Sequence, residues 1–335
     1  MPQDYIDALR RAMWEQDLSP AYISLCCRYA RDLLDRGLPV LFDEAHVRLV
    51  LRMGPVRLRS YHTFYVQGQS GKIREICAPS RPLKLRQRWV LDEILSRVPV
   101  SPAAHGFVRD RSIVTNAMAH IGQESLLCLD IRDFFPSISQ DRVLSVFREL
   151  GYAPGAARAL ADLCCFRGAL PQGAPTSPAL ANAVCRPMDG VLEHRFRAMG
   201  LRYTRYADDI TLSGAGDLSP FLPEAVRVLS AYGFQVNRAK TRLLTGSQRK
   251  LVTGLLVEED RVRVPKAFKR RLRQEIHYCS RFGVSAHLEN SGAEKYVNYR
   301  EHLYGKAYFI HMVEPEAGEA FLRQLDQLDW PEEML

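Results

Sequence analysis

The sequence predicts an α+β protein in which strands form hairpins and helices occupy both ends of the chain. Residues 126–131 form an apolar run of the kind found in a buried strand. Residues 61–77 and 201–212 have the pattern of β-hairpins. Residues 1–53 and 266–335 have a helical pattern. The 335 residues are enough for two or three packed subdomains.

Composition narrows the class of protein. The contents of hydrophobic residues (47%) and charged residues (25%) are those of a soluble globular protein. A net charge of +8 favours a polyanionic partner, although such an excess is common in proteins that bind none. No apolar run is long enough to span a bilayer, and the first residues lack the layout of a secretory signal. We therefore expect no membrane among its partners. Eight cysteines without C-x-x-C spacing indicate reduced core residues in a cytoplasmic protein, and they argue against zinc.

The first 53 residues predict a helical packing layer without chemistry. Ser19 and Pro20 make a good cap and first turn, and Gly37 with Pro39 ends the helix that follows.

The next segment predicts a β-hairpin that carries two cations. Residues 61–66 and 72–77 form its strands, and Lys72 and Arg74 fall on one face of the second strand because side chains alternate. Two cations on such a ribbon could hold a triphosphate, or they could belong to a solvated strand face.

Asp130 lies near the end of the buried strand at 126–131, after helices expected at 83–98 and 112–120. A carboxylate that emerges from a buried strand is costly unless it is paired or bound to a metal. A functional role is therefore favoured for Asp130.

Residues 171–178 predict an exposed backbone ledge between helices expected at 140–150, 155–166 and from 177 to about 199. Gly173 and the neighbouring prolines fix this backbone at a helix start, where NH groups can meet a phosphate or a base pair. A rigid loop without function is the alternative.

Asp208 and Asp209 are expected at the tip of the hairpin formed by residues 201–212. Adjacent like charges are unfavourable unless they share a cation, and oxygen ligands suit Mg²⁺. Taken alone, the pair could be a solvated turn. If this hairpin neighbours the strand of Asp130, the three acids converge. Two divalent ions about 3.5–4 Å apart could then support an in-line displacement at phosphorus, in a polymerase or a nuclease.

The C-terminal part begins with a basic helix. A helix near 220–232, a strand at 242–244 and a closing hairpin at 252–257 and 261–264 come first. The cations crowd the start of the helix that follows: Lys266, Lys269, Arg270, Arg271 and Arg273. They could form a solvated face, but interleaved aromatic residues favour a nucleic-acid surface. Residues 266–335 are expected to form a separate unit with helices near 266–281, 292–312 and 315–328.

Five motifs in series resemble the reverse transcriptases. They are LDIRDFF at 129–135, PQGAPTSP at 171–178, YADD at 206–209, GFQVNRAKT at 233–241 and TGLLV at 253–257. The resemblance implies a right-hand polymerase that uses Mg²⁺ to make DNA on an RNA template. Its implied parts are an N-terminal extension at 1–53, fingers at 54–125 with part of 139–178, a palm at 126–265 and a helical, RNA-binding thumb at 266–335.

The resemblance also implies roles for single residues. Asp130, Asp208 and Asp209 match the catalytic acids that hold two Mg²⁺ ions, together with the carbonyl of Ile131, and Asp208 is expected to be the principal bridge. The residues implied in binding the deoxynucleoside triphosphate are Lys72, Arg74, Asp133, Phe134, Phe135, Gln172, Gly173 and Lys240. Among these, Phe135 is implied to close off the 2′ position, and Lys240 to assist the departing pyrophosphate.

Two short elements resemble the retron type within this family. They are N-A-x-x-H at residues 116–120, with Asn116 and His120, and V-T-G at Val252, Thr253 and Gly254. The resemblance implies a cognate structured non-coding RNA that serves as primer and template for a branched, RNA-linked single-stranded DNA (msDNA). It also implies a part in antiphage defence with an effector protein. The alternatives are a scaffold that binds RNA and msDNA and restrains an effector, and a reverse transcriptase like those of group II introns.

Overall fold

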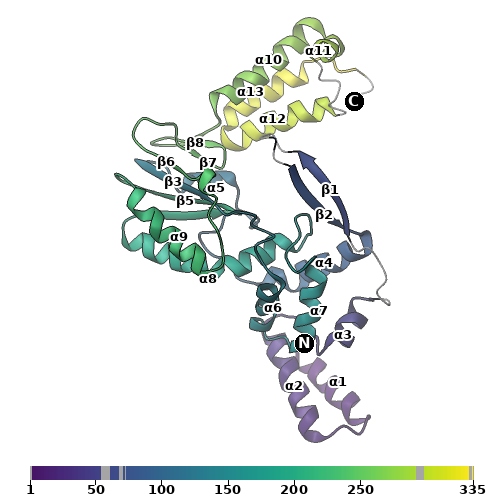
Figure 1. The fold of residues 1–335 in the computed structure, drawn as a ribbon. Coiled ribbons are helices and arrows are strands. Elements are labelled where there is room, and N and C mark those ends of the chain that lie inside the picture. The colour runs from purple at the N-terminus through teal and green to yellow at the C-terminus, as the bar shows by residue number, and fades with distance from the viewer. Residues whose placement is uncertain are drawn as a thin grey trace.

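The computed structural model describes residues 2–53, 61–67, 71, 73–291, 298–331 and 334. A helical hairpin lies at one end, a four-stranded sheet in the middle and a second group of helices at the other end (Figure 1). None of the described helices is long and apolar enough to cross a membrane.

The N-terminal segment is helical, as predicted. Its helices are α1 (Pro2–Trp14), α2 (Pro20–Asp35) and α3 (Glu44–Val50). The hydroxyl of Ser19 accepts a hydrogen bond from the backbone N–H of Tyr22 and caps α2, which confirms the predicted cap.

The predicted ribbon follows, as β1 (Tyr61–Gln67) paired antiparallel with β2 (Ile73–Pro79). Lys72, predicted to share a strand face with Arg74, lies outside the described residues. The ribbon leads into α4 (Arg81–Glu93) and a short 3-10 helix, η1 (Leu95–Arg97).

The central sheet has the strand order β4-β5-β3-β6, and all neighbours are antiparallel. The strands are β3 (Ser125–Asp130), β4 (Arg202–Tyr206), β5 (Asp209–Gly214) and β6 (Arg242–Leu244). Every residue of β3 is buried. The register places Asp130 opposite Asp209 and confirms that the hairpin adjoins the strand of Asp130.

The predicted hairpin differs in one detail. Asp208 lies in the turn, but Asp209 is the first residue of β5 and pairs with Tyr206. The two acids therefore do not share the tip.

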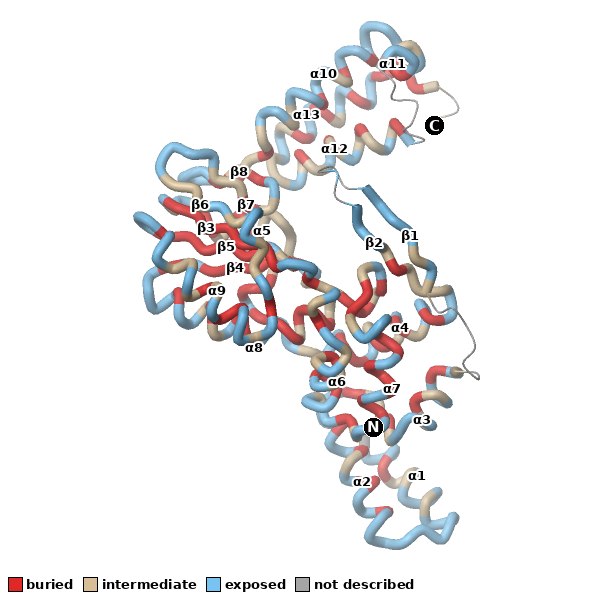
Figure 2. The backbone as a smooth tube through the Cα atoms, in the orientation of Figure 1, coloured by how far each residue is buried: buried red, intermediate tan, exposed pale blue. Residues whose placement is uncertain are grey.

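The other helices of this part of the chain alternate with the strands in sequence. They are α5 (Ile113–Met118), α6 (Gln140–Glu149), α7 (Pro154–Cys164), α8 (Ser177–Ala198) and α9 (Leu222–Ala231), with the 3-10 helices η2 (Ser219–Phe221) and η3 (Arg238–Lys240). Buried positions concentrate in the sheet and in the faces of the helices that cover it (Figure 2). All eight cysteines are buried and free, as predicted for core residues.

A three-stranded sheet connects the central sheet to the C-terminal helices. Its strands are β7 (Leu251–Val252), β8 (Leu255–Val257) and β9 (Val262–Arg263). The prediction of one continuous strand at 252–257 was wrong, because Thr253 and Gly254 form a tight turn between β7 and β8.

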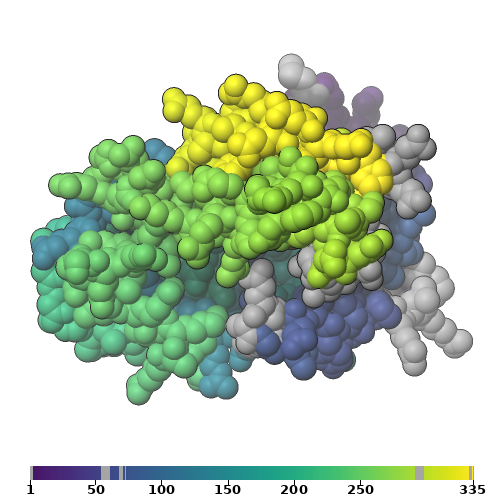
Figure 3. Space-filling view, turned by 90° about the horizontal axis from the view of Figure 1, so that it is seen from above, coloured from purple at the N-terminus to yellow at the C-terminus, as the bar shows by residue number. Residues whose placement is uncertain are grey.

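The C-terminal unit consists of α10 (Lys266–Phe282), α11 (Val284–Ser291), α12 (Tyr299–Val313) and α13 (Pro315–Asp326). The separate helix α11 was not predicted, and residues 292–297, where the next helix was expected to begin, lie outside the described residues. Seen from above, this unit lies over the rest of the molecule (Figure 3).

The side chains on the two faces of β3 pack into two different hydrophobic cores. Leu127 and Leu129 pack with α8 and the N-terminal half of the molecule. Leu126 and Cys128 pack with β7–β9 and the C-terminal unit. Because side chains alternate along a strand, burial on both faces explains the continuous apolar run seen in the sequence.

Candidate active site

An open cleft of about 620 Å³ lies between the β1–β2 ribbon and the central sheet. It is lined by side chains from four places in the chain: Arg74 on β2, Asp130 at the end of β3, Gln172 in the predicted ledge and Asp208 in the turn before β5. These residues are far apart in sequence, and the fold brings them to one surface.

Asp130 is 5% exposed and has two partners from the segment that precedes β6. Its Oδ1 accepts a hydrogen bond from Asn237 Nδ2 at 3.0 Å, and its Oδ2 lies 2.5 Å from Lys240 Nζ. This hydrogen bond is the main reason why the pKa of Lys240 is raised, so the ammonium stays protonated. The sequence left Asp130 either paired or bound to a metal, and in this structure the carboxylate is paired with Asn237 and Lys240.

Asp208 and Asp209 occupy different surroundings. The carbonyl of Asp208 accepts a hydrogen bond from the backbone N–H of Ile131 at 2.9 Å, which joins the turn to the end of β3. Asp208 lines the main cleft with Asp130, whereas Asp209 lines a smaller neighbouring pocket with Arg242 and Thr253.

The carboxylates of Asp208 and Asp209 both have raised pKa values. Loss of hydration is the largest cause, and it raises the pKa of Asp209 to about 6 together with the charges of Asp208 and Asp130. The pKa of Asp208 is raised by the same loss of hydration and by Asp130. Three acids that repel one another in this way favour a bound cation.

The donor set fits Mg²⁺, although its side chains are not arranged around an ion. Among the described residues, no three His, Cys, Asp or Glu side chains lie together as a ready metal site. Lys240 places a positive charge against Asp130 instead. Carboxylate oxygens and the nearby backbone of Ile131 are hard ligands of the kind that Mg²⁺ prefers.

The predicted ledge is fixed to the β1–β2 ribbon. The carbonyl of Gln172 accepts a hydrogen bond from the N–H of Cys77 at 2.8 Å. Gly173 has a φ of 126°, and a Cβ at this position would lie 2.9 Å from the carbonyl oxygen of Cys77. Only glycine allows this backbone to lie so close to the ribbon.

Phe134 and Phe135 also line the cleft, and they differ in burial. Phe134 is 5% exposed and packs against Phe234, with ring centroids 6.1 Å apart. Phe135 is half-buried and lies beside Phe107, at 6.2 Å. Asp133 lies at the cleft with a left-handed backbone (φ 46°).

Sequence reasoning missed three features of the cleft. Asn237 lies within the GFQVNRAKT motif, and its place in that motif was the available signal. Phe107 had no such signal. The ion pair between Arg167 and Glu75, at 3.0 Å, joins the ribbon to the turn before the ledge and becomes visible only in the fold.

Residues 66–279 match the family described as reverse transcriptase (RNA-dependent DNA polymerase). The chain is 37% identical over 304 residues to the retron Mx162 reverse transcriptase of Myxococcus xanthus. It is 32% identical over 292 residues to the retron Ec86 reverse transcriptase of Escherichia coli. The chain belongs to the retron-type reverse transcriptases.

The extent of these matches differs. The match to the Mx162 protein covers 80% of this chain and 61% of that protein, so the chain spans less than two thirds of its length. The match to the Ec86 protein covers 84% of this chain and 85% of that one. A telomerase structure from Candida albicans is 12% identical, with a TM-score of 0.42, and covers 80% of this chain and 63% of that one. The predicted α+β right-hand polymerase fold agrees with the family and with the mixed helices and antiparallel sheets of the structure.

In this retron-type reverse transcriptase, the V-T-G element packs against α5, the helix that carries Asn116. The hydroxyl of Thr253, in the β7–β8 turn, donates to the carbonyl of Ile113 in α5 at 3.2 Å. Val252 is buried in the second core, and Gly254 is exposed at the turn. Thr253 and Ile113 are separated by more than a hundred residues in sequence, and the fold joins them beside the pocket of Asp209.

Asn116 and His120 are buried, at 1% and 0% exposure. The ring nitrogens of His120 lie 2.7 Å from the hydroxyl of Ser213 and 2.8 Å from that of Thr204. Neither side chain reaches the surface in this structure. The direct RNA contact expected of them stays a prediction. In this structure His120 joins the end of α5 to β4 and β5.

The basic residues of α10 are not equivalent. Four of them have exposed side chains: Lys266, Arg270, Arg271 and Arg273. Lys269 is instead 15% exposed and pairs with Glu314 at 2.8 Å, which ties α10 to the start of α13. Its predicted contact with RNA stays a prediction, but its partner here is a carboxylate.

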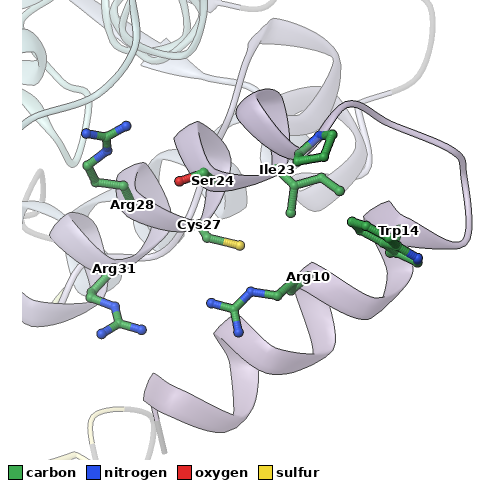
Figure 4. A pocket seen from close by; sticks show the side chains of 8 residues that line it. Arg10, Trp14, Ile23, Ser24, Cys27, Arg28 and Arg31 are labelled. Carbon is green, nitrogen blue, oxygen red and sulfur yellow. The ribbon is translucent and has the colours of Figure 1, made fainter.

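A separate groove of about 410 Å³ lies between α1 and α2, far from the cleft (Figure 4). Arg10 and Arg31 extend toward each other across it, and Trp14 lies at one end. Arg10 pairs with Asp7 at 3.2 Å, and Arg31 donates to Gln3 at 3.1 Å. These cations already have partners within the hairpin.

Proposed function

We propose that this protein is an RNA-directed DNA polymerase that uses a cognate structured RNA as primer and template. The observation that supports this most directly is the meeting of Asp130 and Asp208 in a cleft that also holds Arg74 and the ledge at Gln172. Acids that hold divalent ions, a cation for the triphosphate and a ledge for the base pair are the parts that nucleotide transfer needs.

The metal ions would be held by Asp130, Asp208 and Asp209 with the carbonyl of Ile131. Two bound Mg²⁺ ions supply activation of the attacking sugar hydroxyl and neutralisation of the leaving pyrophosphate. Lys240, which holds Asp130 in this structure, keeps a protonated Nζ that would be available to the departing pyrophosphate.

The remaining cleft residues act on the nucleotide. Arg74, with Lys72, holds the triphosphate, and Phe135 closes off the 2′ position and so selects deoxynucleotides. Phe107 supports the Phe135 ring, and the backbone at Gln172 and Gly173 lies beneath the nascent base pair. Phe134 and Asp133 fix the loop that presents Phe135.

The product proposed is msDNA. Priming from an internal guanosine 2′-hydroxyl of the RNA leaves DNA joined to RNA by a branch, and the complex acts in antiphage defence with an effector protein. The support is the similarity to the Mx162 and Ec86 proteins, which are named retron reverse transcriptases.

The test is DNA synthesis by the purified protein with its adjacent non-coding RNA, Mg²⁺ and deoxynucleotides. The expected product is DNA covalently joined to RNA. An Asp208→Asn/Asp209→Asn variant should lose synthesis, because it removes two of the carboxylates that hold the ions. Asp141→Asn, at an exposed acid on α6 outside the cleft, should keep it. Equal yields from the double variant and the unmodified protein would disprove the assignment.

A further inference from the structure

A buried ion pair lies beneath the turn formed by Ala207 and Asp208 between β4 and β5. Arg205, the fourth residue of β4, has 0% exposed surface. Its Nε donates to Asp189 Oδ1 at 2.8 Å, and its Nη2 donates to Asp189 Oδ2 at 2.7 Å. Asp189, on α8, is also 0% exposed and accepts a further hydrogen bond from the hydroxyl of Tyr203 at 2.7 Å. The pair is bidentate and fully enclosed.

The same guanidinium holds the backbone of the turn. Arg205 Nη1 donates to the carbonyl of Ala207 at 3.1 Å, and Nη2 also donates to Asn182 Oδ1 at 3.0 Å. Ala207 has a left-handed backbone (φ 56°) and directly precedes Asp208. A strained residue of this kind persists when its surroundings hold it in place.

A second backbone segment holds the turn from another side. A Cβ at Gly106 would lie 2.5 Å from the backbone nitrogen of Ala207, so the two backbones are in close contact. Asn182 Nδ2 donates to the carbonyl of Gly106 at 2.9 Å. Asn182 therefore binds both Arg205 and the segment that packs on Ala207. The turn is enclosed between the guanidinium and Gly106.

Stability alone does not explain such a pair. The loss of hydration of two buried charges commonly cancels their attraction, and apolar residues of similar volume are often as stabilising. Arg205 does provide directed hydrogen bonds to a carboxylate, an amide and a backbone carbonyl at once, which neither lysine nor an apolar residue can reproduce.

We propose that Arg205 and Asp189 are positioning residues that set the place of Asp208 and Asp209 relative to Asp130. Arg205 acts through the carbonyl of Ala207, and Asp189 fixes the plane of the guanidinium. The pair thereby couples α8, which begins at the ledge, to the acids of the turn. This inference rests on the proposed polymerase function.

The first test is Arg205→Lys, which keeps the charge and loses the fork of donors. Single-nucleotide extension of a primed RNA template should show kcat lowered by about 10- to 100-fold, because displacement of a catalytic group by about 1 Å has effects of this size. The KM for the nucleotide should stay within about twofold, because Arg74 and the ledge are untouched. Amide hydrogen exchange over residues 205–210, measured without metal or substrate, should become faster.

The matched control is Arg195→Lys. Arg195 is also an arginine ion-paired at α8, but its partner is Glu224 in α9 and it does not contact the turn. This variant should leave both kcat and exchange at residues 205–210 unchanged.

A second variant separates positioning from folding. Arg205→Met/Asp189→Leu removes both charges, so no unpaired charge remains buried, and circular dichroism shows whether the variant is folded. It should show the same loss of kcat and the same faster exchange. A folded double variant with unchanged kcat, or unchanged exchange in both variants, would overturn the proposal. If the unmodified protein makes no DNA at all, the proposed function fails, whereas the exchange measurement still decides whether Arg205 holds the turn.

Discussion

At the scale of single residues, several polar side chains lie in the interior, and each has partners from distant segments. Lys240 and Asn237 hold Asp130, Asp189 holds Arg205, and two hydroxyls flank His120. A buried polar group without a partner is costly, so these side chains constrain how the segments are joined.

His120 gives a prediction about pH. Burial, with the nearby charges of Arg202 and His105, lowers the pKa of His120 to about 3 from an unperturbed value near 6.5. Between these values only the unfolded chain binds the proton, so the free energy of unfolding should fall as pH drops from about 6.5 toward 3. The contribution is at most about 1.4 kcal/mol per pH unit for one proton.

Denaturant unfolding at pH 7, 6 and 5 checks this. His120→Gln should reduce the pH dependence, and the part that remains is expected to include His105, whose pKa is lowered to about 4 mainly by burial. His194→Gln, at an exposed position on α8, should leave the dependence as it is. Equal slopes for all three proteins would contradict the prediction.

At the scale of elements, the turn that contains Ala207 and Asp208 depends on close backbone packing. Gly106 and Ala207 belong to segments that are joined by the hydrogen bond from His105 N–H to the carbonyl of Arg205 at 2.7 Å. Space for a side chain is absent at Gly106 but present at Gly190 in α8, where nothing lies within 4 Å of an added Cβ.

Gly106→Ala should therefore displace the turn and reduce the rate of nucleotide addition by about tenfold or more. Gly190→Ala is the matched substitution. It should leave the rate unchanged and stabilise the helix by up to about 1 kcal/mol, because alanine has the higher helix propensity. Steady-state extension assays and thermal unfolding of both variants check this, and an unchanged rate in Gly106→Ala would show that the turn tolerates the contact.

At the scale of the whole molecule, β3 joins two cores, and the C-terminal unit packs on the second. Four cations of α10 are exposed on this unit, while Lys269 is used to hold α13. Electrostatic binding of RNA and stability of the unit should therefore depend on different lysines and arginines of one helix.

Arg270→Gln/Arg271→Gln should weaken RNA binding and lower the slope of log K against log salt by about 1 to 2, because each lost phosphate contact removes about 0.7–0.9. Lys269→Gln should leave the slope unchanged and lower the unfolding temperature, because it leaves Glu314, at 16% exposure, without its lysine. Binding titrations at several salt concentrations check both. A slope unaffected by the arginine pair would place the RNA elsewhere.

The sequence by itself determined the local elements, the order of the five motifs and the expectation that Asp130 needs a partner. Periodicity, caps and turns are short-range properties, so they are visible in a single chain. Only the tertiary structure decided which side chains meet. Lys240 reaches Asp130 across 110 positions, Thr253 reaches Ile113 across 140, and Arg205 meets Asp189 inside the core. It also made Lys269 a partner of Glu314 and enclosed His120. These pairings depend on the register of strands and on the packing of helices, and both are set by the burial of apolar faces from distant segments at once.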